Sequence, residues 1–164
     1  MSGQAGLAYA FELTHHSEVS TRATLLRLAE RHHEDHEVHH VASDLALWSA
    51  DNMYRLSQVA AAHDLDLEAH PGNPGGRSAV REAASALVRH RPETGIVLLE
   101  GLRDAYLAAS KTSLAWEMLA QHAQAAREED VLDLTTACHP QTLRQVRWCN
   151  TMLKTLSPQV LASL

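Results

Sequence analysis

The chain contains three Glu-x-x-His motifs, whose residue types and spacing are suited to binding metals. They are Glu12 with His15, Glu30 with His33, and Glu37 with His40. In di-metal carboxylate sites of four-helix bundles, two helices each supply a Glu and the other two each supply a Glu-x-x-His. Positions three apart share one helix face, so the carboxylate can bridge two metals while the imidazole binds one of them. The last part of the chain contains no such motif. The sequence therefore predicts no standard di-iron carboxylate site.

The direction of the side chains also argues against the motif at residues 37–40. Counting about 100° per residue along the predicted second helix places Glu34 and Asn52 inside the bundle and Glu37 on the border. The same count predicts that three histidines point outward: His36, His39 and His40.

A single layer of polar residues is predicted halfway along the bundle. All four predicted helices contribute inward polar groups at this level: His15, Glu18, Asn52, Ser113, Glu117, Thr142 and Gln145. We favour a hydrogen-bonded layer that fixes the register of the helices, as buried polar groups do in coiled coils. The alternative is a reduced metal or small-ligand site in which His15, Glu18 and Glu117 bind Fe, Mn or Zn.

Histidine is abundant, with 12 residues in the chain, and a cluster of them lies between residues 32 and 40. Histidines four apart, as in His32/His36 and His36/His40, can chelate Zn, Ni or Cu on a helix surface. A pH-sensitive patch is a second alternative, because imidazoles titrate near neutral pH. We favour a third interpretation, a solvated helix end at which Glu, Asp and His offset one another.

Nucleophilic catalysis has little support in the sequence. Cys138 and Cys149 both fall on an apolar stripe, where inert core thiols are found. No Gly-x-Ser-x-Gly turn is present, and the Gly/Pro-rich stretch 71–76 contains no Lys for a phosphate and follows no predicted strand. We therefore expect a protein that is not an enzyme, although the sequence leaves the question open.

Helices must position these residues, because Ala and Leu are abundant and aromatic residues make up only 4% of the chain. The apolar pattern predicts one domain, 1–164, with helices at 7–33, 35–64, 93–128 and 130–157. Residues 65–92 are predicted to form a long connection, a loop followed by a short helix capped by Ser78. Tight turns are predicted at 33–35 and 127–130, with Asp130 as the N-cap of the last helix.

Two prolines bear on the last helix. Pro140 lies inside it and predicts a kink, whereas residues 157–158 predict its end. The alternative is a single helix from Glu93 to Cys138 and a short last helix after Pro140. The sequence leaves this alternative open, and we favour the break at 127–130.

The order of turns predicts the topology. A tight first turn, a long middle crossover and a tight last turn match a ferritin-like four-helix bundle, because an up-down-up-down bundle needs no crossover of that length. Trp48 and Trp116 fall on the predicted buried faces. Trp148 points away from its buried face. An exposed Trp there would suit a contact in a homo-oligomer, and the alternative is the chance exposure of a single aromatic side chain.

Charge and hydropathy exclude two classes of partner. The formal net charge of −6 argues against binding to nucleic acid through its phosphates. No apolar run approaches the roughly 20 residues of a membrane-spanning helix, and the N-terminus lacks a signal-peptide pattern. We therefore expect a cytoplasmic protein with neither a nucleic acid nor a membrane as its partner.

Two stretches of the chain carry a resemblance. They are DHEVHHVASDLALW at 35–48 and ACHPQTLRQVRW at 137–148, with LRDAY at 102–106 and Trp116 between them. Together they resemble an uncharacterised bacterial family of ferritin-like helical bundles. The resemblance implies a ferritin-like bundle and no assigned activity. Pro140 and Gln141 stand where it leads us to expect acidic residues, which weakens a metal site on that helix.

The sequence thus predicts a non-catalytic, ferritin-like helical bundle with a role in binding or association. The alternative is a ferritin-like protein that binds Fe, Mn or Zn at the reduced mid-bundle site. The sequence identifies no substrate, small-molecule ligand or partner.

Overall fold

The computed structural model describes residues 2–72 and 94–164. They form four helices: α1 (Ser2–Arg31), α2 (His36–Ala62), α4 (Thr94–Ala126) and α5 (Glu129–Ala162). The described residues contain no strand, so the predicted all-α, four-helix fold is confirmed. The short helix predicted after Ser78 lies outside the described residues. No helix in the described part of the chain is both long enough and apolar enough to cross a membrane.

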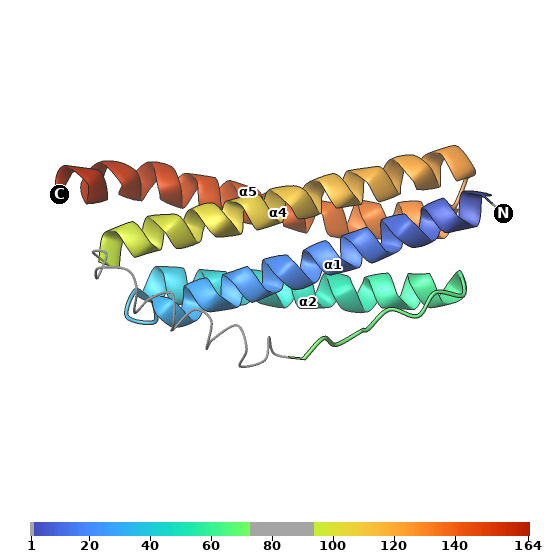
Figure 1. Cartoon of the computed structure of the whole chain (residues 1–164), viewed down its shortest axis with the longest axis horizontal. Coiled ribbons are helices and arrows are strands. Elements are labelled where there is room, and N and C mark those ends of the chain that lie inside the picture. Colours follow the sequence, from blue (N-terminus) through green and yellow to red (C-terminus); the bar gives the residue numbers. More distant parts are fainter. Residues whose placement is uncertain (1, 73–93) are drawn as a thin grey trace.

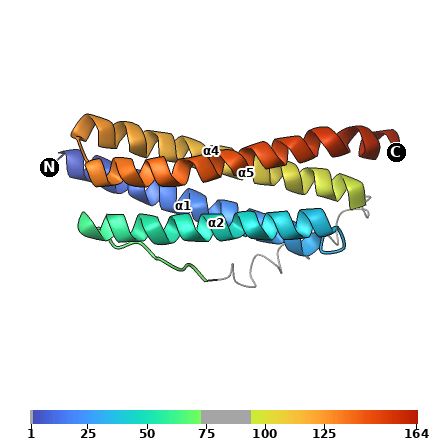
Figure 2. The same cartoon turned by 180° about the vertical axis from the view of Figure 1, so that it is seen from behind.

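The four helices pack as two antiparallel hairpins that lie side by side (Figure 1, and from behind in Figure 2). α1 packs against α2 in the first hairpin, and α4 packs against α5 in the second. Between the hairpins, α1 packs closely against α4, whereas α2 and α5 contact each other sparsely. α2 ends and α4 begins at opposite ends of the bundle, so these two helices run in the same direction (Figure 1).

The described part of the connection after α2 runs back along the first hairpin. Leu65 packs, partly buried, against the core. The carbonyl oxygen of Glu68 lies 2.7 Å from Nε2 of His15. The carbonyl oxygen of Pro71 accepts a hydrogen bond from Arg22 at 3.5 Å. These contacts advance along α1 as the chain advances, so the segment runs parallel to α1.

The predicted first turn is confirmed, since α1 ends at Arg31 and α2 begins at His36. Asp35 is the N-cap of α2, and its carboxylate accepts a hydrogen bond from the backbone N–H of Val38 at 3.1 Å. Glu34 lies in the turn and is exposed, so the prediction that it faces the bundle interior is wrong. The rotation of about 100° per residue applies only within the helix, and Glu34 lies before the N-cap.

The predicted break between the last two helices is also confirmed, since α4 ends at Ala126 and α5 begins at Glu129. The prediction that Asp130 caps α5 is wrong. Glu128 holds the N-cap position without a side-chain cap hydrogen bond, and Asp130 lies in the first turn of the helix. A carboxylate oxygen of Asp130 instead lies 2.8 Å from Nε2 of His63, at the end of α2.

α5 runs through both of its prolines, so the predicted end at 157–158 is wrong. The alternative in which the last helix begins only after Pro140 is wrong as well. A proline leaves the carbonyl four residues earlier without its usual N–H donor. Those carbonyls belong to Thr136 and Lys154, both exposed residues, so water can take the place of the missing donor.

Two helix ends extend beyond their predicted limits, and each packs on a neighbouring helix. α1 begins at Ser2 rather than at 7, and a Cβ added to Gly6 would lie 3.5 Å from Cε1 of His122 in α4. α5 continues past its second proline, where a Cβ added to Gly95 of α4 would lie 2.9 Å from Cγ1 of Val160. These tertiary contacts favour helix where the local Gly and Pro residues disfavour it.

Two apolar cores fill the bundle. One lies toward the turn between α1 and α2 and includes Leu25 and Leu102, and the other lies toward the opposite end and includes Phe11 and Trp116. Trp48 and Trp148 are both partly buried against the first core. From the sequence, Trp148 is predicted to point away from the core. The structure instead packs its side chain against the core.

The two cysteines lie one in each core and are free thiols. Burial raises the pKa of Cys138 and of Cys149 to about 12. Because the thiolate is the nucleophile and the metal ligand, these side chains behave as small apolar groups at neutral pH. This agrees with their predicted position on the apolar stripe.

Candidate functional site

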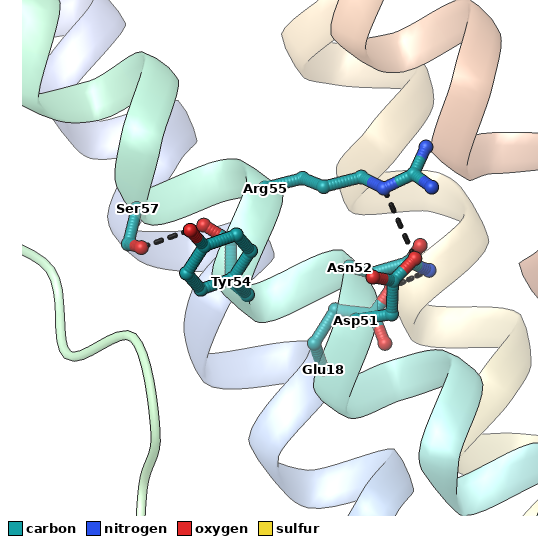
Figure 3. A network of polar contacts seen from close by, with 6 residues as sticks. All are labelled: Glu18, Asp51, Asn52, Tyr54, Arg55 and Ser57. Carbon is teal, nitrogen blue, oxygen red and sulfur yellow. Dashed lines mark hydrogen bonds and ion pairs between the residues drawn. The ribbon is translucent and has the colours of Figure 1, made fainter.

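A layer of buried polar side chains lies halfway along the bundle, between the two apolar cores. Its centre is Glu18 of α1, which is 0% exposed, and Asn52 of α2 and Thr142 of α5 are equally buried. Figure 3 shows Asn52 directed at Glu18, whereas Asp51 and Arg55 pair with each other on α2. The predicted mid-bundle polar layer is therefore present in the fold.

Each of the other three helices donates a hydrogen bond to the same carboxyl oxygen of Glu18. Nδ2 of Asn52 donates from α2 at 2.9 Å, and Nε1 of Trp116 donates from α4 at 2.8 Å. Oγ1 of Thr142 donates from α5 at 3.4 Å. One oxygen atom, Oε1, thus links α1 to the three other helices through neutral donors.

Further hydrogen bonds extend the layer on both sides of Glu18. Nε2 of Gln145 donates to Oγ of Ser49 at 2.9 Å and to a backbone carbonyl of α2 at 2.9 Å. The Ser49 hydroxyl is also one of the groups that lower the pKa of the Glu18 carboxyl. The hydroxyls of Thr21 and Thr112, 2.8 Å apart, join α1 to α4. Hydrogen bonds at this level thus join α1 to each of the other three helices and α5 to α2.

The setting of Glu18 disfavours its charged form relative to that of a carboxyl in water. Burial raises the pKa of its carboxyl, and the hydrogen bonds from Trp116, Asn52, Ser49 and Thr142 lower it only in part. None of the described groups that act on this pKa is a positive charge. All three contacts go to Oε1, while Oε2 is buried without a partner among the described residues.

The structure does not bring Glu18 together with the other two predicted metal ligands. His15 is half-buried, and its Nε2 contacts the carbonyl oxygen of Glu68. Glu117 is exposed and lies near His139 of α5. Burial lowers the pKa of His139, and the charge of Glu117 opposes that effect. His15, Glu18 and Glu117 are thus not a three-ligand group in the folded protein.

Two members of the central layer were not predicted from the sequence, the donor Trp116 and Ser49, which accepts from Gln145. A buried indole N–H needs a hydrogen-bond partner, and Ser49 lies three residues before Asn52 on the same helix face, so both carried a usable signal. Ser113 lies at the predicted level, but its hydroxyl contacts Nε2 of His139 at 2.9 Å instead of Glu18.

The histidine cluster at 32–40 does not gather its three predicted ligands. His32 is buried, and its pKa is lowered by burial and by Arg31, which Asp35 opposes. His36 and His40 are exposed, and their rings stack with centroids 6.0 Å apart at 16° to each other. The pair on α2 and the buried ring at the end of α1 thus form no three-ligand group in the described structure.

No family model matches this chain, and neither the curated proteins nor the solved structures include a significant match to it. The resemblance to ferritin-like bundles therefore stays a prediction.

Proposed function

We propose that this chain is a non-catalytic helical bundle with ferritin-like connectivity and a role in binding or association. Three features support the connectivity: two antiparallel hairpins, a connection that begins and ends at opposite ends of the bundle, and the shared direction of α2 and α4 (Figure 1). α2 packs against α1 and α5, and α4 packs against the same two helices. This places α2 and α4 on a diagonal, as a crossover between hairpins requires.

The observation that carries the proposal is that neutral donors from three helices bind one oxygen of Glu18. Oε2 of Glu18, Oδ1 of Asn52 and Oε1 of Gln145 are buried without a partner among the described residues. Ferritin-like metal sites are built in the bundle core from inward carboxylates and imidazoles. Here the inward carboxyl, Glu18, accepts from three neutral donors on one oxygen, and burial favours its neutral form. A carboxyl must lose its proton to bind a metal. The layer is therefore better suited to fixing helix register than to metal chemistry.

The outer face of α4 offers a surface for association. Leu107, Leu114 and Met118 are 47%, 59% and 49% exposed. Their spacing of seven and four residues places them on one face of the helix. These three apolar side chains share their face with the exposed Lys111, which lies between Leu107 and Leu114. They suit a symmetric contact in which two copies of the chain present the same face, and two-fold dimers are the commonest oligomers. We therefore propose a second copy of the chain as the partner.

Sedimentation equilibrium of the full chain tests this association. We expect a dimer for the wild type and a dimer dissociation constant raised about tenfold or more by Leu114→Lys, because a charge then replaces an apolar anchor at the contact. Leu47→Lys is the matched control, since Leu47 is 66% exposed on α2. A wild type that stays monomeric, or two lysine variants that behave alike, would contradict the α4 contact.

A further inference from the structure

A group of three potential metal ligands lies at the end of the bundle where α2 ends and α5 begins. Nε2 of His63 lies 2.8 Å from Oδ2 of Asp130. One ligand atom from each of His63, Glu128 and Asp130 lies within 4.8 Å of the other two. These residues belong to the bundle end, outside the central layer around Glu18.

The ends of two helices position this group. His63 is the C-cap of α2, and the next residue, Asp64, turns the chain with a φ of 60°. Arg127 turns the chain after α4 with a φ of 61°, and Glu128 follows it directly. The ring of Phe11 lies against the ring of His63, with centroids 6.0 Å apart. The imidazole is thus packed against an aromatic ring and also contacts a carboxylate.

A cavity of about 420 Å³ adjoins the group and gives it access to solvent. His63 and Glu128 line it, together with His122 of α4 and Leu7 of α1. The His63 side chain is only 18% exposed, whereas that of Asp130 is 49% exposed. An ion held by these residues would keep coordination positions open toward the cavity for water or a further ligand.

We propose that His63, Glu128 and Asp130 bind a divalent first-row transition metal ion, for which Zn²⁺ is the probe. An imidazole nitrogen favours such ions over Mg²⁺ and Ca²⁺, which prefer oxygen ligands alone. Two carboxylates match the double positive charge. Tetrahedral Zn²⁺ with bonds of about 2.0–2.2 Å holds its ligand atoms about 3.5 Å apart. The three side chains reach that spacing through small changes from their present separations.

The bound ion would link the two hairpins where they contact each other least. His63 ends α2 of the first hairpin, whereas Glu128 and Asp130 begin α5 of the second, and α2 packs only sparsely against α5. His63 and Asp130 are 67 residues apart in the chain. An ion that binds the folded site and not the unfolded chain stabilises the folded state. Zn²⁺ should therefore raise the melting temperature.

Calorimetric titration of the full chain, purified without a His-tag, with Zn²⁺ tests the proposal. We expect one site per chain, with an affinity about tenfold or more lower in Asp130→Asn and in His63→Gln, because each loses a direct ligand. Glu129→Gln is the matched control, since it removes the same charge next to Asp130 at a residue outside the group. It should keep the wild-type affinity and the Zn²⁺-dependent rise in melting temperature.

Two outcomes would overturn the proposal. One is a wild type that binds no Zn²⁺, or binds it as tightly as Asp130→Asn does. The other is a site lost in the double variant His36→Ala/His40→Ala but kept in His63→Gln, which would place the ion on the surface of α2. Circular dichroism of each variant shows that the fold is intact, and the exposed Asp130 is the safest position for this comparison.

Discussion

Replacing Glu18 with alanine should lower the free energy of unfolding by about 3–5 kcal/mol, whereas glutamine should keep it within about 1 kcal/mol of the wild type. Alanine leaves a cavity and removes the acceptor of Asn52, Trp116 and Thr142 together. Glutamine keeps an oxygen for those three donors. Its amide N–H₂ takes the place of the other oxygen, Oε2. Urea unfolding of the three proteins measures both differences.

The advantage of Glu18→Gln over the wild type should grow with pH. In the folded protein burial raises the pKa of Glu18, while the unfolded carboxyl titrates near its ordinary value of about 4.3. The raised pKa makes its full contribution to stability at pH values below the pKa of the unfolded carboxyl. This contribution is lost as the pH rises toward the folded pKa, because the unfolded chain then releases a proton that the folded chain holds. Glutamine does not titrate, so the free energy of unfolding of Glu18→Gln lacks this dependence on pH.

Asp51→Asn is the matched control for this pH series. It makes the same carboxyl-to-amide change on the neighbouring helix, at a side chain that is 47% exposed and paired with Arg55 (Figure 3). An exposed ion pair of this kind contributes at most about 1 kcal/mol, so this variant should show little change across the series. Equal costs for Glu18→Gln and Glu18→Ala would show that the layer needs a charged carboxylate, contrary to the proposal.

Trp116→Ala should also cost about 3–5 kcal/mol of unfolding free energy, as expected for a fully buried aromatic side chain. The change opens a cavity in the core at the Phe11 end and removes the indole donor to Glu18. Trp116→Phe separates the two effects, because it keeps most of the ring volume and loses only the N–H. We expect Trp116→Phe to cost about 1–2 kcal/mol.

Trp48→Ala provides the comparison for this pair. Trp48 is only partly buried at the edge of the other core, so its removal should cost less than that of Trp116. Denaturant unfolding of the three variants measures how much unfolding free energy each one loses. If Trp116→Phe proves as stable as the wild type, the indole hydrogen bond contributes nothing to the layer. If Trp48→Ala loses more unfolding free energy than Trp116→Ala, the core next to Trp48 contributes more to stability than the core at the Phe11 end.

The helical architecture could be predicted from the sequence because the apolar spacing and the two charged turns carry strong local signals. The turn before α2 ends in a capping Asp35, and the break before α5 falls where the apolar pattern is interrupted. The end of α5 could not be predicted in the same way. Ser157 and Pro158 locally favour a stop, but Val160 packs against Gly95, a residue distant in the chain.

The level of the central layer could be predicted, but the direction of its side chains could not be predicted in full. Counting residues from the two turns brings Glu18, Asn52 and Thr142 to one height, and the structure places them together. Glu117 lies at the same height as Trp116, but one residue is about 100° of rotation on a helix. Trp116 therefore faces the interior and Glu117 faces solvent.

The group at the bundle end carried no signal that sequence spacing could detect. His63 and Asp130 are distant in the chain, and neither belongs to a recognisable ligand motif. They meet at the end of the bundle where α2 and α4 both end, and a residue with a positive φ lies just after each of these helices (Figure 1). Such positive φ values at Asp64 and Arg127 are uncommon outside glycine, so the two turns could not be assigned from residue type alone.

Metal analysis of the full chain, purified without a His-tag from cells supplied with Fe, Mn and Zn, tests the structural role of the central layer most directly. We predict that Glu18→Gln and Glu117→Ala leave the metal content unchanged, and that any Zn present is lost in Asp130→Asn. Stoichiometric Fe, Mn or Zn that disappears in both Glu18→Gln and Glu117→Ala would contradict the proposal and place a metal centre in the layer.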